Sequence, residues 1–207
     1  MAEMTLWGTL IAGGIVMIPI FALSIIELTL VIYHFFALRE KSVFPSDLVA
    51  TISKLVEEEN FKEAAQTCER NSAYITNILK LGIEKAGAPY VILKEAFLDA
   101  GIRETARLKS GIVYLSMIAV LSPMLGLLGT VLGMMQAFGS IAYESAIGKP
   151  ELLAGGIAKA LVTTAAGLFV GIPSMGFYYY FRAKSQSIAV KSQEISSMFL
   201  LKLAIRR

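Results

Sequence analysis

The longest uncharged stretch of the sequence limits the fold more strongly than any other feature. Ser110 to Tyr143 spans 34 positions without an Asp, Glu, Lys, Arg or His. A helix of about 20 apolar residues is long enough to cross a bilayer. The composition agrees, because 17% of the residues are charged, against about a quarter in an average soluble domain. The sequence therefore predicts an all-α integral membrane protein.

Composition and motifs disfavour several other classes. The net charge of +3 is small and no basic-aromatic stripe is present, so nucleic acid is not an expected partner. The single cysteine, Cys68, cannot form an internal disulfide or a Cys-based metal cluster. The sequence has no phosphate loop and no paired His or Cys residues at ligand spacing. Neither a cofactor nor a metal is therefore expected. Met1 to Met4 contain no Lys or Arg, which disfavours a cleavable signal peptide.

Three segments are long and apolar enough to span the membrane. Gly13-Gly14 and Pro19 interrupt the first apolar run, so the residues before them are expected to form an interfacial helix anchored by Trp7. Tyr178 to Tyr180 form an aromatic belt at the end of the third span. The expected order is an outer-face interfacial helix at 1–14, transmembrane spans at 15–38, 111–142 and 152–181, a cytoplasmic helical domain at 39–110, a periplasmic loop at 143–151 and a cytoplasmic tail at 182–207.

The distribution of Lys and Arg predicts the orientation. Of the 19 basic residues, Arg39 to Lys109 holds 11 and the tail from Arg182 holds six, and the others are Lys149 and Lys159. Loops on the cytoplasmic side carry an excess of Lys and Arg. We therefore expect a periplasmic N-terminus, a cytoplasmic middle region and a cytoplasmic C-terminus.

The middle region balances 11 acidic against 11 basic residues and has a helical apolar period. Its caps and breakers predict a small helical domain. The residues that define it are, in order, a first turn at Pro45-Ser46-Asp47, the cap Asn60 with its helix Phe61 to Arg70, a helix from Ser72 to Lys85, the breakers Gly87 and Pro89, and a long helix to Lys109 with apolar residues at Ile92, Ala96 and Leu98.

The second and third spans carry small residues three or four positions apart, on one face of each helix. In lipid such residues let two helix backbones approach closely, so this face is expected to be a helix–helix seam. Thr130 and Thr164 have two interpretations: a hydroxyl that bonds its own helix one turn back, or a hydroxyl that lines a polar path. The small and packing residues are Ser122, Gly126, Gly129, Gly133, Ala160, Thr163, Gly167, Gly171 and Pro173.

Two charged residues lie inside the spans, where a charge costs about 3 kcal/mol on insertion scales and usually faces protein or water. Glu27, near the middle of the first span, either makes a buried hydrogen bond or ion pair or belongs to an ion pathway. Lys159, about two turns inside the third span, either snorkels to the outer interface or faces a pathway. His34, near the inner end of the first span, is expected to contact water.

Two motifs of the spans resemble those of a known family. Residues 125–138 read Leu-Gly-Leu-Leu-Gly-Thr-Val-Leu-Gly-Met-Met-Gln-Ala-Phe, and residues 156–173 read Gly-Ile-Ala-Lys-Ala-Leu-Val-Thr-Thr-Ala-Ala-Gly-Leu-Phe-Val-Gly-Ile-Pro. They closely resemble the MotA/TolQ/ExbB proton-channel family, and Gly-Gly-x-x-Met-Ile-Pro-Ile at 13–20 resembles its ExbB and TolQ branch. MotA-type stators have four spans, so three spans favour ExbB or TolQ.

The resemblance implies a subunit of a proton-driven motor in the bacterial inner membrane, and not an enzyme. Five copies would form a homo-oligomeric ring around an ExbD- or TolR-like single-span partner, with a TonB- or TolA-like protein as a further candidate partner. Protons would pass an aspartate of the single-span partner, and their flux would energise outer-membrane transport or envelope processes. In this family a threonine of each motif lines the polar path, and the resemblance implies that role for Thr130 and Thr164.

Lys159 and Glu27 depart from the family pattern. Members commonly have Glu at the position of Lys159, and a small or apolar residue at the position of Glu27. We hypothesise that the two charges compensate each other, directly, through water or between neighbouring copies. Counted from the basic ends at Arg39 and Arg182, their depths differ by about 16 Å, which counts against direct contact. Alternatively, Lys159 faces the central pore and orients the partner's aspartate.

Other functions remain open at this stage. The chain could be the stator of a gliding or other motility motor of the same family, or a non-conducting membrane scaffold. A small membrane enzyme is disfavoured because 11 of the 16 acidic residues lie in the middle region and not in a cluster at one interface. An intramembrane serine protease is disfavoured because Gly139-Ser140 lies at the outer end of a span, with no histidine at comparable depth. Ring size, the system served and the choice of proton or sodium are left open.

Overall fold

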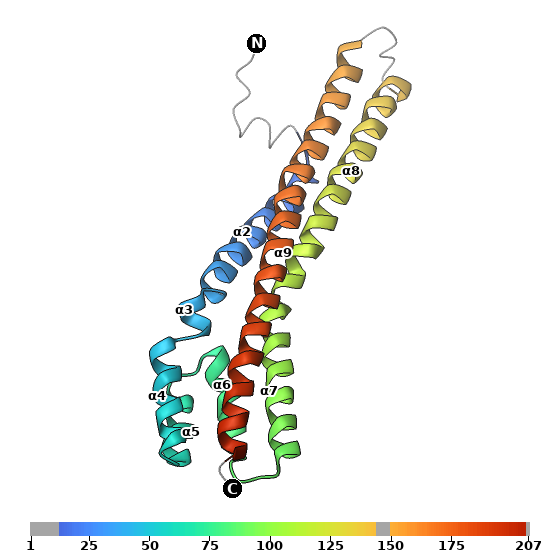
Figure 1. Ribbon diagram of the computed structural model, residues 1–207. Coiled ribbons are helices and arrows are strands. Elements are labelled where there is room, and N and C mark those ends of the chain that lie inside the picture. The colour runs from blue at the N-terminus through green and yellow to red at the C-terminus, as the bar shows by residue number, and fades with distance from the viewer. Residues whose placement is uncertain (1–12, 144–149, 206–207) are drawn as a thin grey trace. The chain divides into compact units, whose positions relative to one another are not determined.

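The computed structural model describes residues 13–143 and 150–205, and within them every regular element is a helix (Figure 1). The predicted interfacial helix before Gly13 and most of the predicted loop at 143–151 lie outside these residues. The contacts divide the chain into two compact units, here called the membrane unit (Met1–Val31 and Val113–Tyr179) and the polar unit (Ile32–Ile112 and Tyr180–Arg207). The helices are α2 (Met17–Ala37), α3 (Glu40–Val43), α4 (Ser46–Glu57), α5 (Phe61–Arg70), α6 (Tyr74–Ile83), α7 (Tyr90–Ser110), α8 (Ile112–Tyr143) and α9 (Pro150–Ile205).

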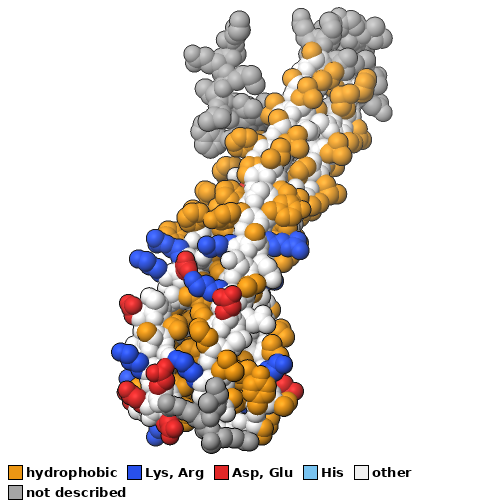
Figure 2. Space-filling model, in the orientation of Figure 1, with side chains coloured by type: hydrophobic (Ala, Val, Ile, Leu, Met, Phe, Trp, Pro, Cys, Tyr) orange, Lys and Arg blue, Asp and Glu red, His pale blue; other side chains and the backbone are white. Residues whose placement is uncertain are grey.

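The membrane unit contains most of α2, nearly all of α8 and the first part of α9. Three helical segments are long and apolar enough to cross a membrane, within residues 17–37, 90–139 and 154–204. Their outer faces expose large apolar side chains such as Ile18, Leu127 and Phe169, and hydrophobic side chains cover this unit in Figure 2. Apolar surface of this extent needs lipid or protein to cover it. Inside the unit, Val16, Met17, Ile20, Ile118 and Val170 form a core between the helices.

The polar unit consists of the end of α2, helices α3 to α7 and the last part of α9, and its surface carries many Lys, Arg, Asp and Glu side chains (Figure 2). Asn60 caps α5, because its side chain accepts a hydrogen bond from the Glu63 backbone N–H at 3.3 Å. Gly87 has φ +85°, which suits a glycine in the turn before α7. Apolar side chains of α4, α6 and α7 fill the centre, chiefly Ile52, Val56, Ile75, Ile78, Leu79, Ile83 and Leu93.

One expectation for the polar unit was wrong in detail. The helix predicted from Ser72 to Lys85 is α6, Tyr74–Ile83. It starts later because Thr76 Oγ1 donates to the Asn71 carbonyl at 2.7 Å and accepts from the Ala73 N–H at 2.8 Å, which holds those residues in a turn. The face of α7 that packs inward holds Leu93, Phe97 and Ala100, whereas Ile92 and Leu98 are exposed. Phe97 determines this face, because its ring lies directly over Gly82 of α6, where a Cβ would stand 2.1 Å from the ring.

The helix α9 is longer than the sequence predicted. It runs for 56 residues, past the expected end of the span at Phe181 and through the whole described tail. An 11-residue repeat has 3.67 residues per turn, close to the 3.6 of an α-helix, so residues at this spacing stay on one face. On α9 a buried hydroxyl occurs at each step of this spacing, at Thr163, Ser174, Ser185 and Ser196. The same face of the helix is therefore buried in both units.

Candidate functional site

Six glycines lie where α8 and α9 pack together: Gly126, Gly129 and Gly133 of α8, and Gly156, Gly167 and Gly171 of α9. A Cβ at Gly129 would stand 2.3 Å from Thr163 Oγ1, and one at Gly167 would stand 2.4 Å from the Ser122 carbonyl oxygen. Such distances leave no room for a side chain, so the backbones touch as they do at small-residue contacts in membranes. The seam consists of Ser122, Gly126, Gly129 and Gly133 on α8 with Ala160, Thr163, Gly167 and Gly171 on α9. Pro173 is exposed and lies outside it.

Thr163 and Thr164 place their hydroxyls at this seam. Thr164 Oγ1 donates to the Gly126 carbonyl of α8 at 3.1 Å. Thr163 Oγ1 donates to the Ala160 carbonyl of its own helix at 2.7 Å and lies 3.4 Å from the Gly126 carbonyl. The hydroxyl of Thr164 therefore joins the two helices, whereas that of Thr163 satisfies its own helix.

Thr130 lies beside an open hollow on α8. Its hydroxyl donates to the Leu127 carbonyl one turn back, at 2.6 Å, which is the first of the two interpretations for this residue. The hollow is otherwise lined by Val131, Met134, Met135 and Phe138. Thr130 thus supplies the hydroxyl of an otherwise apolar concave surface.

The hydrogen bonds of Thr130 and Thr164 determine what these groups can bind. A hydroxyl has one proton and two lone pairs. Because each proton already goes to a carbonyl, the oxygen offers only lone pairs to anything else. In this arrangement such an oxygen can accept a hydrogen bond from water, hydronium or a protonated acid. The arrangement suits protons and other cations, and it does not activate a nucleophile.

Glu27 is the acidic residue of α2, and its side chain points into the membrane unit. The residue is 8% exposed, although its neighbours Ile26 and Leu28 are largely exposed. Its carboxyl group lies near the Ser174 hydroxyl of α9, outside the geometry of a standard hydrogen bond. Ser174 is fully buried, and its Oγ makes no hydrogen bond with the described residues. Sequence reasoning missed Ser174, and the 11-residue spacing of hydroxyls along α9 was the signal that could have found it.

Lys159 lies against the start of the first span. A Cβ at Gly14, which has φ +71°, would stand 2.8 Å from Lys159 Cε and 3.0 Å from its Nζ. Gly14 and Glu27 are about 20 Å apart at helical rise. No ion pair between Lys159 and Glu27 occurs in the described part of the chain. A direct pair within one copy is therefore not formed, and compensation through water or between copies stays a hypothesis.

His34 does not contact water as expected, because it is 2% exposed. Within the polar unit its ring packs against Phe181, with the ring centroids 5.6 Å apart. Gly111, at the junction of α7 and α8, makes room for it, since a Cβ there would stand 2.6 Å from His34 Cε1. The imidazole is thus part of the packing between helices of this unit.

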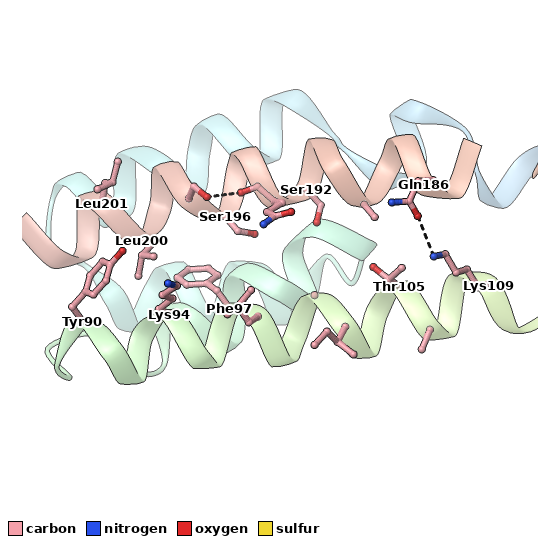
Figure 3. A pocket seen from close by; sticks show the side chains of 17 residues that line it. Tyr90, Lys94, Phe97, Thr105, Lys109, Gln186, Ser192, Ser196, Leu200 and Leu201 are labelled. Carbon is pink, nitrogen blue, oxygen red and sulfur yellow. Dashed lines mark hydrogen bonds between the residues drawn. The ribbon is translucent and has the colours of Figure 1, made fainter. Parts of the chain in front are cut away.

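A groove runs along the polar unit between α7 and the last part of α9 (Figure 3). Apolar side chains such as Leu98, Ile102 and Leu201 line it together with polar ones. At one end Lys109 Nζ donates to Gln186 Oε1 at 3.3 Å. In the described residues no group of three or more His, Cys, Asp or Glu side chains could hold a metal ion.

Comparisons with known proteins agree with the motifs of the spans. Residues 54–194 match the sequence model of the MotA/TolQ/ExbB proton channel family. The chain is 30% identical to the putative biopolymer transport protein ExbB-like 3 of Synechocystis over 173 residues, 83% of this chain and 82% of that protein. It is 37% identical to the biopolymer transport protein exbB1 of Vibrio cholerae over 41% of this chain, and 36% identical to the Tol-Pal system protein TolQ of Haemophilus influenzae over 44%. These two matches span 42% and 41% of the relatives' own length.

Proposed function

Because the chain belongs to the MotA/TolQ/ExbB proton channel family, we propose that it is the channel-forming subunit of a proton-driven motor in the inner membrane. In this proposal several copies of the chain form a ring around an ExbD- or TolR-like single-span protein. The family resemblance implies five copies. Proton flux through the ring energises outer-membrane transport or envelope processes. The observation that carries the proposal is the family match over residues 54–194, which includes both span motifs.

Thr130 and Thr164 are the proposed polar groups of the proton path. Both hydroxyls donate hydrogen bonds to carbonyl oxygens, so the oxygen of each can accept a hydrogen bond from a passing water or from a protonated carboxyl of the partner. Contacts of this kind are weak enough to be exchanged quickly, as conduction requires. We propose that two ionisable residues, Lys159 and Glu27, also act on this path, because both lie in the membrane unit.

The proposed orientation places the polar unit in the cytoplasm. Basic residues follow the inner ends of the first and third spans, at Arg39, Lys41, Arg182 and Lys184. An excess of Lys and Arg beside spans marks the cytoplasmic side. The N-terminus is then periplasmic and the C-terminus cytoplasmic.

Exposed apolar surface supports assembly of several copies. The membrane unit exposes apolar side chains on all three of its helices, and lipid or another protein must cover them. In the polar unit, which we place outside the lipid, the groove between α7 and α9 exposes Ile102 and Leu201. We propose that a neighbouring copy covers this groove in the ring.

Reconstitution tests the proposed function. The full chain would be co-expressed with an ExbD- or TolR-like protein from its source organism and placed in phospholipid vesicles that enclose a pH-sensitive dye. We expect acidification under a membrane potential only when both proteins are present, and none when the aspartate in the partner's span is replaced by Asn. Equal acidification with the wild-type and the Asn partner would contradict a proton channel that runs past the partner's aspartate. Native mass spectrometry would count the copies in the ring.

A further inference from the structure

We propose that Glu27 and Ser174 form a proton-binding site inside each copy of the chain, between α2 and α9. The site is separate from the Thr130 and Thr164 hydroxyls and needs no partner protein. It rests on the proposed function in one respect, the placement of α2 and α9 in the membrane, and it gives Glu27, which we propose acts on the proton path, the specific role of binding a proton.

The first observation is the burial of an isolated acid. Glu27 is the one Asp, Glu, Lys or Arg residue of α2. Of the four consecutive residues 25–28, Ile25, Ile26 and Leu28 are exposed, and Glu27 is the one that is buried. An ionisable side chain so placed in a membrane segment faces protein or a water-filled cavity and marks a functional site by default.

The second observation is the unused hydroxyl opposite Glu27. Serine and threonine in helices commonly donate to a carbonyl one turn back, as Thr29 does to Ile25 at 2.8 Å and Ser197 to Gln193 at 2.8 Å. Ser174 is fully buried and, like Ser122 and Ser185, makes no such bond, but of these three it is the one that lies near Glu27. Buried polar atoms without a partner are rare, so this hydroxyl is available to the nearby carboxyl group.

No positive charge of the described residues neutralises Glu27 within one copy. Among the described residues no basic side chain lies within ion-pair distance of its carboxyl group. The other titratable side chains described in the membrane unit are Lys159, Tyr178 and Tyr179 on α9 and Tyr114 on α8, and Tyr33 and His34 follow further along α2. Lys159 lies against Gly14, about 20 Å from Glu27 at helical rise, and His34 is two turns along α2. A proton is therefore the available counter-charge.

A carboxyl and a serine hydroxyl can bind and release a proton without a counter-ion. When a carboxylate oxygen of Glu27 takes a proton from water, the new O–H can donate to Ser174 Oγ, and the serine proton can turn to a carbonyl of α9. When that proton returns to water, the serine O–H can turn and donate to the carboxylate. Rotation of one hydroxyl thus satisfies both protonation states.

Labelling with dicyclohexylcarbodiimide tests the proposal. This apolar reagent adds to a protonated carboxyl to give an O-acylisourea, which rearranges to a stable N-acylurea without loss of atoms. The full-length chain alone, in vesicles of phosphatidylethanolamine and phosphatidylglycerol, would be labelled across a pH series and mapped by peptide mass spectrometry. We expect an adduct on Glu27 that decreases as the pH rises, and none on the exposed Glu58. Absence of an adduct on Glu27 at every pH would overturn the proposal.

Two variants and one ion complete the test. Ser174→Ala should increase labelling at neutral pH severalfold, because hydrogen bonds to a charged group are the stronger ones and the carboxylate loses its donor. Thr29→Val removes a hydroxyl that serves its own helix and should leave labelling unchanged. Equal labelling of Ser174→Ala and wild type would exclude the role of Ser174, and protection of Glu27 by sodium at constant pH would replace the proton site by a metal-ion site. A chain that labels as expected but conducts no protons would contradict the proposed function alone.

Discussion

Gly167 of α9 lies against the main chain of Ser122 of α8, so close that a Cβ on Gly167 would stand 2.4 Å from the Ser122 carbonyl oxygen. The obstructing atom belongs to the backbone and cannot rotate away. The same seam carries the Thr164 to Gly126 hydrogen bond, and thus fixes where the proposed path residues stand. Changes at this contact should affect stability and conduction together.

Gly167→Ala should destabilise the membrane unit by about 1–3 kcal/mol, since overpacking forces the two helices apart. Gly176→Ala is the matched control, because nothing lies within 4 Å of a Cβ there. The control should be neutral or more stable by up to about 1 kcal/mol, as alanine is the better helix former. Thermal unfolding in mild detergent, followed by circular dichroism, compares the two. Equal melting temperatures would contradict the close contact.

Cys68 should be nearly inert to thiol reagents in the folded protein. The residue is buried in the polar unit, and burial raises the pKa of its thiol to about 11. The thiolate is the reactive form, so both access and ionisation oppose the reaction at neutral pH. Maleimide labelling should be at least about 100-fold slower in the native protein than in dodecyl sulfate. Fast labelling of the native chain would show that α5 does not pack as described.

The contact between Glu40 and Lys191 predicts a dependence of stability on pH. The hydrogen bond from Lys191, together with its charge, holds the pKa of the exposed Glu40 carboxyl below its usual value. The contribution of this pair is therefore complete above the usual glutamate pKa, and it is lost as the pH falls through the lowered one. Glu40→Gln should lower the melting temperature slightly at pH 7 and make no difference at strongly acidic pH. A difference that grows on acidification would contradict the assignment.

Lys159→Met should reduce proton flux with little change in stability. The apolar side chain of Met can keep the packing over Gly14 that the Lys159 stem makes, while the positive charge is lost. We expect assembly with the partner to be normal and the rate of vesicle acidification to fall severalfold. Unchanged flux would show that the ammonium group does not act on the path.

The sequence was sufficient for features that depend on local chemistry. Asn60 as a cap and Gly87 as a break predicted the starts of α5 and α7, because caps and turns depend on a few neighbouring residues. The glycine spacing of the second and third spans predicted which faces would meet. The continuation of α9 past Phe181 was missed because Arg182 and Lys184 end the apolar run without ending the helix.

Features that depend on register between helices could not be predicted. The inward face of α7 follows from the fit of Phe97 on Gly82 of α6, which no periodicity of α7 alone contains. The same holds for His34 over Gly111, and for Glu27 beside Ser174, which are 147 positions apart in the chain. Contacts of this kind join distant residues, and only the packed structure brings them together.

Proton flux through a Thr164→Val variant tests the central claim most directly. Valine keeps the shape of threonine but removes the hydroxyl that we propose accepts a hydrogen bond on the proton path, whereas Thr164→Ser retains it. In vesicles with the single-span partner, we predict that Thr164→Val assembles normally and loses most of its proton flux, and that Thr164→Ser retains most of it. Wild-type flux through an assembled Thr164→Val ring would contradict the account.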